Sequence, residues 1–440
     1  MTPGARLQAA IELVAAIHGG TAPADRVAHE FFRERRYIGG GDRREVLALV
    51  YKMLRARARL DWWVSRAIPS GEAPLPEPDR VRLIAALALI EGWSPDRVAG
   101  SFDGGRYRPL PLTSEERALL RALAGQPLDH PEQPDWVRLE FPEWLEADLR
   151  AALGDAFGPE MRALMAEAAT DLRVNALKAE RAAALRALKA EGVLAEPTPL
   201  SPLGLRVEGR PPLAPLEVFK SGAVEVQDEG SQLVALLTDA RPGMRAVDFC
   251  AGAGGKTLAL AAQMKNKGHI VACDVLEGRV MRAATRLRRA GVHNVERRAL
   301  KSERDPWVKR HAGDFDRVLV DAPCSGSGTW RRNPDQKWRL TREGLDELIA
   351  LQARILESAC RLVKPGGRLV YATCSLLTAE NEAQVERFLG AHPGFAPLPV
   401  PAVWAQAVGT PCPVEGPWLR LTPARHGTDG FFAAILERRS

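Results

Sequence analysis

The chain has 440 residues, of which 46% are hydrophobic and 26% charged, and its formal net charge is +6. This length suits two or three globular domains, and no run approaches the ~20 apolar residues of a membrane span or the pattern of a secretory signal. The six cysteines show neither the spacing of a disulfide framework nor a CxxC pair. We therefore expect a cytoplasmic protein without structural disulfides or a bound metal.

The N-terminal part is predicted to be all helical. Over residues 5–125 apolar side chains recur at helical spacing, as at Leu7, Ile11, Val14 and Ile17, with no alternating strand pattern. Residues 1–60 hold eleven Lys or Arg against six Asp or Glu, whereas residues 131–170 hold three against nine. A basic patch is the electrostatic footprint expected for nucleic acid, but a solvated helical surface gives the same pattern.

Arginines and aromatic residues are interleaved within this helical part. Such a mixture suits phosphate contact combined with base stacking. For Trp62 and Trp63 we favour burial in the helical core, because large aromatic side chains are mostly buried. The residues concerned are Phe31, Phe32, Arg33, Arg35, Arg36, Tyr37, Arg43, Arg44, Tyr51, Arg55, Arg57, Arg59, Trp62 and Trp63.

A small α+β module is predicted to follow. Three prolines within residues 126–134 indicate a linker, and a helical pattern covers residues 135–170. A strand at 172–177, a helix at 181–191 and a strand at 204–208 then favour a ferredoxin-like or RRM-like module. We expect domains at residues 1–130, 135–235 (with the leading helices) and 236–440.

From residue 230 onward, short apolar strands alternate with helices. This alternation predicts a doubly wound α/β domain, Rossmann-like, with a parallel sheet covered on both faces. A late edge strand is expected at residues 431–436. The other strands are expected at 245–249, 270–274, 317–321 and 368–373, and the helices at 256–264, 278–290 and 343–363.

A glycine-rich turn follows the first of these strands and opens a helix. Its sequence, D-F-C-A-G-A-G-G-K-T over residues 248–257, lets a ligand approach the backbone, and the helix N-terminus favours negative charge. A nucleoside triphosphate fits residues 255–257, which resemble the end of a P-loop, although Cys250 replaces its first glycine.

Two other ligands fit the same turn. NAD would use Gly252 and Gly254, although Thr257 stands where the fingerprint has its last glycine. S-adenosylmethionine would place its amino acid part against the glycines and its ribose hydroxyls on Asp274, which ends the next strand. Because that acid also suits NAD, the turn by itself leaves all three ligands open.

Two cysteines at strand ends favour the methyl donor. Cys324 follows one predicted strand and Cys374 the next, at the sheet edge where α/β proteins bind ligands. Neither an NTPase nor a hydride-transfer enzyme needs two thiols there, whereas methylation of a pyrimidine at carbon 5 does. A thiolate that adds to carbon 6 makes carbon 5 nucleophilic, and a second group helps to release the product. The remaining cysteines are interpreted as ordinary packing residues, with Cys250 lining the donor pocket.

At this point the motifs are similar to those of the RNA cytosine-5 methyltransferases of the Sun (RsmB-like, NOP) family. The helical N-terminal part resembles the NusB-like RNA-binding domain of the bacterial small-subunit rRNA enzymes. The similarity covers nearly the whole chain. The matching segments are residues 172–175, 225–232, 321–328, 332–335, 371–375, 380–382 with Val385, and 427–432.

This resemblance implies a role for each site residue. Cys374 is expected to be the nucleophile, Cys324 the helper in product release, and Asp321 the group that hydrogen-bonds the cytosine at the border of the donor site. In DNA cytosine methylation the Pro-Cys cysteine attacks, which would be Cys324, but the Thr-Cys-Ser motif favours Cys374. The expected S-adenosylmethionine-binding residues are Cys250, Ala251, Gly252, Ala253, Gly254, Gly255, Lys256, Asp274 and Asp321.

Two departures from the family pattern affect the donor site. The glycine turn lacks the usual proline, which softens it. The family's acid near the adenine is missing, because Arg297 and Arg298 stand there, with Glu303 a few residues on. The basic, aromatic loop at residues 330–339 is expected to hold an RNA backbone and wall off the target base, because it lies close to Cys324, with an ordinary surface loop as the alternative.

The sequence therefore predicts a monomeric methyltransferase acting on RNA, most simply small-subunit ribosomal RNA, to make 5-methylcytosine. A catalytically silent RNA-binding or assembly factor and a P-loop NTPase are the alternatives. The intact cysteine motifs argue against the first alternative, and residues 255–257 are the reason for the second.

Overall fold

The computed structural model describes residues 1–67, 76–209 and 211–439. The chain forms two compact units. Unit 1 contains Met1–Ala147 together with Trp330–Leu340, and unit 2 contains Asp148–Thr329 and Thr341–Ser440. A short piece of the C-terminal half thus belongs with the N-terminal helices.

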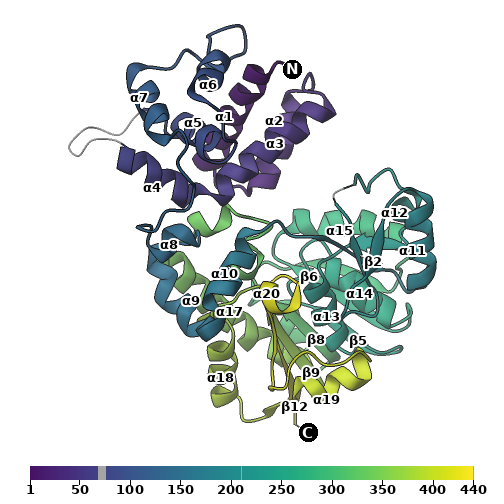
Figure 1. The fold of residues 1–440 in the computed structure, drawn as a ribbon. Helices are drawn as coiled ribbons and strands as arrows, with labels where there is room; N and C mark the ends of the chain where they lie inside the picture. Colours follow the sequence, from purple (N-terminus) through teal and green to yellow (C-terminus); the bar gives the residue numbers. More distant parts are fainter. Residues whose placement is uncertain (68–75, 210, 440) are drawn as a thin grey trace. The chain divides into compact units, whose positions relative to one another are not determined.

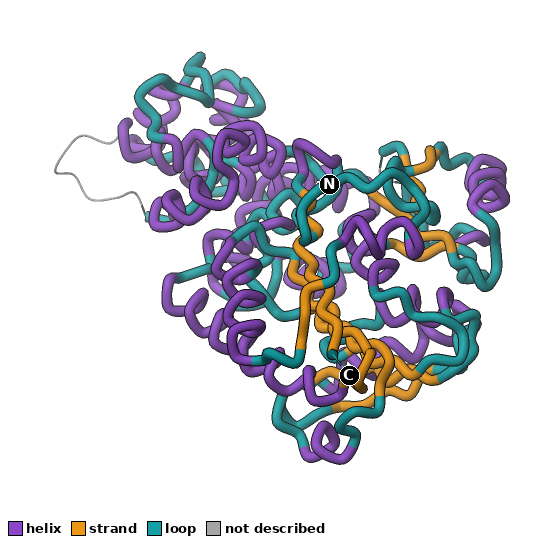
Figure 2. Tube along the Cα trace, turned by 90° about the horizontal axis from the view of Figure 1, so that it is seen from below, coloured by secondary structure: helices purple, strands orange, loops and turns teal. Residues whose placement is uncertain are grey.

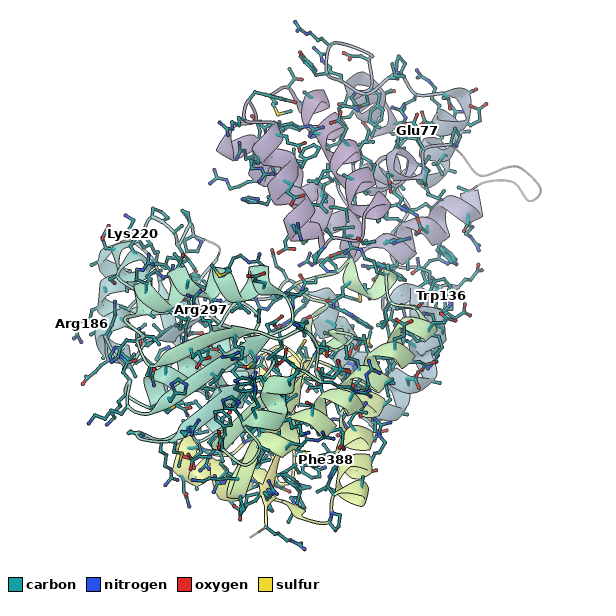
Figure 3. All side chains as sticks on the ribbon, turned by 180° about the vertical axis from the view of Figure 1, so that it is seen from behind. Glu77, Trp136, Arg186, Lys220, Arg297 and Phe388 are labelled. Atoms are coloured by element: carbon teal, nitrogen blue, oxygen red, sulfur yellow. The ribbon has the colours of Figure 1, made fainter. Side chains whose placement is uncertain are left out.

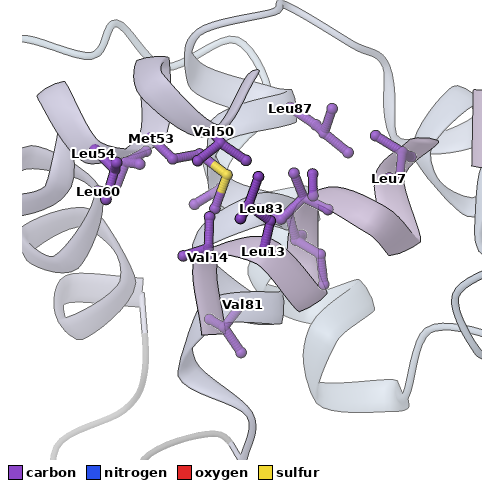
Figure 4. Packing of buried hydrophobic residues seen from close by; sticks show 14 of the residues in the cluster. Leu7, Leu13, Val14, Val50, Met53, Leu54, Leu60, Val81, Leu83 and Leu87 are labelled. Atoms are coloured by element: carbon purple, nitrogen blue, oxygen red, sulfur yellow. The ribbon is translucent and has the colours of Figure 1, made fainter. Parts of the chain in front are cut away.

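Unit 1 is helical, as predicted. Its core forms around α5, where residues 83–87 are fully inaccessible to solvent. Leucine and valine side chains of α1 and α3 pack onto this helix, and Figure 4 shows Leu13, Val50 and Leu83 at the centre of the cluster. The helices are α1 (Pro3–Gly19), α2 (Ala24–Glu34), α3 (Gly40–Arg55), α4 (Arg57–Ala67), α5 (Pro78–Leu89), α6 (Pro95–Ser101), α7 (Ser114–Leu123) and α8 (Asp135–Arg138).

The proline-rich segment predicted as a linker is packed against α4. Trp63 is buried and its indole nitrogen donates a hydrogen bond to the Leu128 carbonyl at 3.0 Å. The His130 ring lies 5.2 Å from the Trp62 ring, and Trp62 packs on the same core. The two tryptophans therefore belong to the helical core, as expected, and they hold this segment in place.

The small module of unit 2 has the predicted α+β character. Its sheet has the strand order β2-β3-β1-β4 with antiparallel neighbours, and Leu172, Leu188 and Leu205 are buried between sheet and helix. The elements are α9 (Glu146–Leu153, beginning in unit 1), α10 (Phe157–Met165), β1 (Thr170–Val174), α11 (Arg181–Ala190), β2 (Ala195–Pro197), β3 (Gly204–Val207), α12 (Glu217–Lys220) and β4 (Val224–Val226).

Asn175, which follows β1, connects this module to the larger α/β part by hydrogen bonds. Its amide nitrogen donates to the carbonyls of Gly222 and Ala290, both at 2.9 Å. A side chain on Gly222 would come within 2.2 Å of the Arg289 carbonyl oxygen. The two parts of unit 2 therefore meet through backbone contact that requires glycine.

The α/β part has the predicted doubly wound fold (Figure 1). Its sheet runs in the order β10-β12-β9-β8-β5-β6-β7, with β11 paired to β12, and the five strands from β9 to β7 are parallel. The strands are β5 (Arg245–Asp248), β6 (His269–Asp274), β7 (Val295–Ala299), β8 (Phe315–Asp321), β9 (Val363–Thr373), β10 (Phe395–Pro397), β11 (Leu419–Leu421) and β12 (Phe431–Arg438).

The strand predicted at 431–436 is present as β12, but its predicted position at the edge of the sheet was wrong. β12 pairs antiparallel with β9 on one side and with β10 and β11 on the other. Residues 431–436 are all buried and apolar, which suits a strand covered on both faces rather than an exposed edge.

Helices cover both faces of this sheet, as the strand layer in Figure 2 shows. Alternate residues of β8 enter opposite cores: Val318 and Val320 pack with α16, α17 and α18, and Leu319 packs with α13, α14 and α19. The helices are α13 (Glu229–Leu237), α14 (Gly255–Gln263), α15 (Glu277–Ala290), α16 (Pro306–Arg310), α17 (Arg342–Ala359), α18 (Glu382–Ala391), α19 (Val400–Ala407) and α20 (Pro423–His426). Within the described ranges no helix combines the length and apolarity that crossing a membrane requires.

Candidate active site

The two motif cysteines lie side by side at the carboxyl ends of adjacent parallel strands. Asp321 of β8 is in register with Ala372 of β9, so the loops that follow these strands begin together. The sulfur atoms of Cys324 and Cys374 are 3.4 Å apart, and both residues are partly accessible. Two thiols in this arrangement can act on a single substrate atom or on neighbouring ones.

The two sulfur atoms have different electrostatic surroundings. The hydrogen bond with Cys374 and burial raise the pKa of Cys324 well above the usual thiol value, and the nearby Glu380 acts in the same direction. Cys324 therefore keeps its proton and can donate it toward the sulfur of Cys374. The pair is thus suited to one thiolate at a time.

An ion pair links the glycine turn to the cysteine strands. The Lys256 ammonium on α14 lies 2.7 Å from the Asp321 carboxylate at the end of β8. Burial alone would lower the pKa of Lys256, but the charges of Asp321 and Asp248 raise it, so the lysine stays protonated. Thr257 donates to Asp248 at 2.7 Å. Lys256 and Thr257, the side chains that would bind phosphate and its metal ion in a P-loop, are therefore both bonded to carboxylates of the protein.

The glycine turn is shaped by two residues with left-handed backbones. Gly252 has φ +54° and Gly254 has φ +82°, and a Cβ on Gly254 would lie 3.1 Å from the Ala283 side chain. The Asp274 carboxylate accepts hydrogen bonds from the backbone N–H groups of Gly252 (2.9 Å) and Leu276 (2.8 Å). Asp274 thereby closes the turn against the end of β6. A Cβ on Gly252 would meet nothing within 4 Å, so a ligand has room to approach there.

Asp248 of β5 is an unusual acid beneath this turn. It is fully buried, its Oδ2 accepts from Thr257, and its Oδ1 has no hydrogen-bond partner. Burial raises the pKa of Asp248 to about 7, and the negative charge of Asp321 adds to the effect.

The pH dependence of stability should therefore change in Asp248→Asn. Between pH 4 and 7 the folded protein keeps a proton that the unfolded chain loses, so stability falls as pH rises and the penalty is complete above about pH 7. We expect the variant to gain roughly 4 kcal/mol relative to the native chain over this interval, as three pKa units imply. Denaturant unfolding at several pH values measures the difference, and a pH-independent difference would contradict the assignment.

The other cysteines have packing environments, as interpreted from the sequence. Cys273 and Cys360 are buried in the sheet core, and burial raises both pKa values, that of Cys360 to about 12. Burial also raises the pKa of Cys250, which lies in the glycine turn. Cys412 is half-buried and its thiol donates to the Val414 carbonyl. Within the described residues, only Cys324 and Cys374 form a hydrogen-bonded thiol pair.

Close backbone packing explains the C-terminal glycine motif at residues 427–432. The Gly430 N–H donates to the Gly328 carbonyl at 2.8 Å, and a Cβ on Gly328 would lie 2.4 Å from the Gly430 carbonyl oxygen. The Gly328 N–H in turn donates to the carbonyl of Cys374 at 2.9 Å. This strand end therefore supports both cysteine loops.

Arg297 and Arg298 stand where the family has an acid near the adenine, and Glu303 is the acid that follows them. Arg297 is an exposed residue of the sheet edge β7, where Figure 3 labels it. The Glu303 carboxylate accepts a hydrogen bond from Arg354 of α17 at 3.0 Å. Glu303 is thus engaged with α17.

The loop at residues 330–339 is buried or half-buried throughout, so it is not an ordinary surface loop. It belongs to unit 1, where Trp330 is 1% and Lys337 2% exposed. Asp335 accepts a hydrogen bond from the Ala24 N–H at 3.2 Å, and burial lowers the pKa of Lys337 to about 8 although Glu140 raises it. Asp335 and Lys337 therefore pack within unit 1, a tertiary contact that composition did not indicate, and contact of this loop with RNA stays a prediction.

Sequence reasoning assigned no individual role to Glu380 and Gln352. Both are fully buried, and both hydrogen-bond to the residues beside Cys324. Glu380 is part of the family motif at residues 380–382, and Gln352 lies in an amphipathic helix whose pattern does not distinguish it from other polar residues.

Comparison with known proteins identifies the family. Residues 235–437 match the family model described as 16S rRNA methyltransferase RsmB/F, and residues 141–214 match the RsmF/B-like ferredoxin-like domain. The probable ribosomal RNA small subunit methyltransferase B of Synechocystis is 32% identical over 90% of this chain and 91% of its own length. The ribosomal RNA small subunit methyltransferase B of Thermus thermophilus is 32% identical over 90% and 89%.

Solved structures agree with this relationship. The crystal structure of PH0851 is 28% identical and covers 100% of this chain and 99% of that one, with a TM-score of 0.79. A methyltransferase homolog protein from Pyrococcus horikoshii is 29% identical and covers 69% and 97%, with a TM-score of 0.59. The predicted family and the predicted methyl donor are both confirmed. The chain belongs to the RsmB/F family of S-adenosylmethionine-dependent methyltransferases.

Proposed function

We propose that this protein methylates carbon 5 of a cytosine in small-subunit ribosomal RNA through a covalent adduct between Cys374 and carbon 6. The observation that carries the proposal is the pair of sulfur atoms 3.4 Å apart at adjacent strand ends. The names of the related proteins support ribosomal RNA as the substrate. The target base has to leave its stack to reach a sulfur inside the protein.

The donor site fits S-adenosylmethionine, which supplies an electrophilic methyl group on a sulfonium sulfur. Open space above Gly252 admits the amino acid part, and Asp274 ends the strand next to the turn. We assign donor contact to the turn residues Cys250 to Lys256, to Asp274 and to Asp321. The Lys256–Asp321 ion pair lies between this turn and the cysteines, so the donor and the base would meet beside it.

The chemistry needs one thiolate for attack and one for release. Cys374 forms a bond to carbon 6, carbon 5 accepts the methyl group, and the proton on carbon 5 must then leave before the bond to Cys374 breaks. The largest cause of the raised Cys324 pKa is its hydrogen bond to Cys374. Once Cys374 is bonded to the ring, that cause disappears, so Cys324 can release its proton to solvent and then accept the one on carbon 5, and the net reaction releases one proton for each methyl group transferred. Expulsion of Cys374 as thiolate restores the starting pair.

Asp321 would hold the cytosine during these steps. Its side chain is 31% exposed, so it can reach a ligand while it remains paired with Lys256. Its carboxyl oxygens can accept a hydrogen bond from the exocyclic amino group of cytosine, which uracil lacks. We assign base recognition to this residue.

Unit 1 offers an exposed basic surface for RNA. Arg33, Arg36, Arg44 and Tyr37 are exposed around the turn between α2 and α3, and Tyr37 is 73% exposed. Phe31 and Phe32, by contrast, are buried in the core. Phosphate contact and stacking are therefore assigned to the exposed members of the sequence cluster.

The donor assignment predicts the effect of Asp274→Ala. Loss of the carboxylate removes the acceptor for ribose hydroxyls and frees the Gly252 N–H, so we expect affinity for S-adenosylmethionine to fall about tenfold or more. Isothermal titration calorimetry with S-adenosylmethionine and, separately, with ATP measures the effect. Tight ATP binding would favour the P-loop NTPase, and donor affinity unaffected by the substitution would contradict the role of Asp274.

The reaction itself is tested with RNA that carries tritium at carbon 5 of cytosine. Small-subunit ribosomal RNA, naked or assembled with its proteins, is incubated with the enzyme and S-adenosylmethionine. Methylation at carbon 5 must release one tritium to water for each methyl group incorporated. Methyl incorporation without tritium release would indicate another atom, and neither signal would favour the silent RNA-binding factor.

A further inference from the structure

Glu380 carries a buried carboxylate between the two cysteine loops. It ends the short helical turn Thr378–Glu380 and is fully inaccessible to solvent. Its Oε1 accepts hydrogen bonds from the Ser325 N–H (2.8 Å) and the Gln352 amide (2.9 Å), and its Oε2 accepts from the hydroxyls of Ser325 and Ser375, both at 2.5 Å. These four donors are all neutral groups.

The donors are the immediate neighbours of the reactive thiols. Ser325 follows Cys324, and Ser375 follows Cys374. A single carboxylate therefore holds the backbone and side chain next to one thiol and the side chain next to the other. The two oxygens cannot keep all four bonds unless the loops stay together.

Neighbouring amides complete this arrangement. Gln352 of α17 also donates to the Pro323 carbonyl at 3.0 Å, so the residues on both sides of Cys324 are held. Asn381 donates to the Ser375 carbonyl at 2.9 Å and accepts from Thr373 at 2.5 Å, so both sides of Cys374 are held as well.

Fold stability alone is a poor explanation for this charge. A buried carboxylate costs several kcal/mol in lost hydration, and its hydrogen bonds at best offset that cost. The benefit of such a group is fixed geometry, because charge-assisted hydrogen bonds are short and directional. Reacting groups need to be held to within a fraction of an ångström.

We propose that Glu380 is a positioning residue that locks the loops of Cys324 and Cys374 together, so that both sulfur atoms reach the same pyrimidine ring. The inference rests on the proposed function for its benefit to catalysis. The geometry that it invokes concerns the protein alone and can be measured without RNA.

A comparison of three variants tests this role. Glu380→Ala removes all four hydrogen bonds. Glu380→Gln keeps them, because the amide oxygen can replace Oε1 and the amide nitrogen can donate to the two hydroxyls, which are able to accept. Glu160→Ala is the matched control: Glu160 is a buried carboxylate that accepts from Thr422 (2.6 Å) and from the Ala424 N–H (2.8 Å), both near α20.

The first readout is the rate at which diamide, which takes up two electrons and two protons, oxidises the thiol pair to a Cys324–Cys374 disulfide. We expect this rate to fall about tenfold or more in Glu380→Ala, to stay near the native value in Glu160→Ala and to be no lower than the native value in Glu380→Gln. Because the Glu380 charge raises the pKa of Cys324, its loss by itself would speed the oxidation, so a slower reaction in Glu380→Ala reports lost positioning. The second readout is tritium release, where kcat should fall roughly a hundredfold in Glu380→Ala with little change in KM. Thermal unfolding shows whether the two alanine variants lose comparable stability.

Equal oxidation rates in Glu380→Ala and Glu160→Ala would overturn the positioning role. If Glu380→Ala does not fold, Ser375→Ala removes the bond from Glu380 to the Cys374 loop, together with the contacts of this hydroxyl with Ser325, Ser327 and the Leu377 N–H, and must slow the oxidation. The two proposals can fail separately. If disulfide formation is slower in Glu380→Ala than in the native protein, but the native protein releases no tritium, the proposed reaction is refuted and the positioning role stands.

Discussion

Cys374→Ala should abolish methyl transfer while S-adenosylmethionine still binds. Carbon 5 of cytosine is not nucleophilic by itself, and without the sulfur no bond to carbon 6 can activate it. Removal of a nucleophile that acts as part of a unit costs roughly ten-thousandfold or more in rate. The glycine turn joins β5 to α14, and Asp274 ends β6, so the residues assigned to the donor there lie on other elements than Cys374. The affinity of the variant for S-adenosylmethionine, measured by calorimetry, should therefore be unchanged.

Cys412→Ala is the matched control for this experiment. Cys412 is also half-buried and lies in the same unit, but its thiol donates to the Val414 carbonyl rather than to another thiol. Tritium release at the native rate is expected from this variant. Full activity in Cys374→Ala together with its loss in Cys324→Ala would transfer the attack to Cys324.

Cys324→Ala should accumulate a covalent protein–RNA complex, whereas Cys374→Ala should form none. Attack and methyl transfer remain possible because Cys374 is intact, but the proton on carbon 5 has lost its acceptor. Removal of a general base slows the affected step by roughly a hundredfold or more. The enzyme should therefore stop after one methyl transfer, still bonded to RNA.

Denaturing gel electrophoresis with labelled RNA detects this complex. The band should depend on S-adenosylmethionine for its methyl label and should be absent in the double variant Cys324→Ala, Cys374→Ala. Multiple turnover at the native rate, with no retained RNA, would exclude a release function for Cys324.

Much of the architecture was available from the sequence, because local patterns encode it. Apolar residues at helical spacing around Leu13 and Val50 defined the N-terminal helices, and the alternation after residue 230 defined the doubly wound domain. β12 was misplaced at an edge because a short apolar run does not disclose its neighbours. Pairing is a long-range choice, made here by the antiparallel register with β9.

The identity of the candidate site residues was likewise fixed in the chain. Cys324, Cys374, Asp321 and the glycine turn were all selected from motifs, since chemistry requires particular side chains at strand ends. The contacts between these residues were not encoded locally. The two thiols are separated by 50 positions in the sequence, and Lys256 and Asp321 by 65. The parallel register of β8 and β9 brings the two thiols together, and α14 brings Lys256 to Asp321.

Tertiary structure alone decided the parts played by Glu380 and by residues 330–339. A glutamate after a strand and a basic, aromatic loop both look like solvent-exposed features, because their composition is polar. In the folded protein Glu380 and Lys337 are both buried. Glu380 accepts hydrogen bonds from both cysteine loops, and Lys337 is packed within unit 1. The sequence determined which groups could react, and the fold determined which of them meet, because hydrogen bonds and ion pairs depend on distances that no local pattern records.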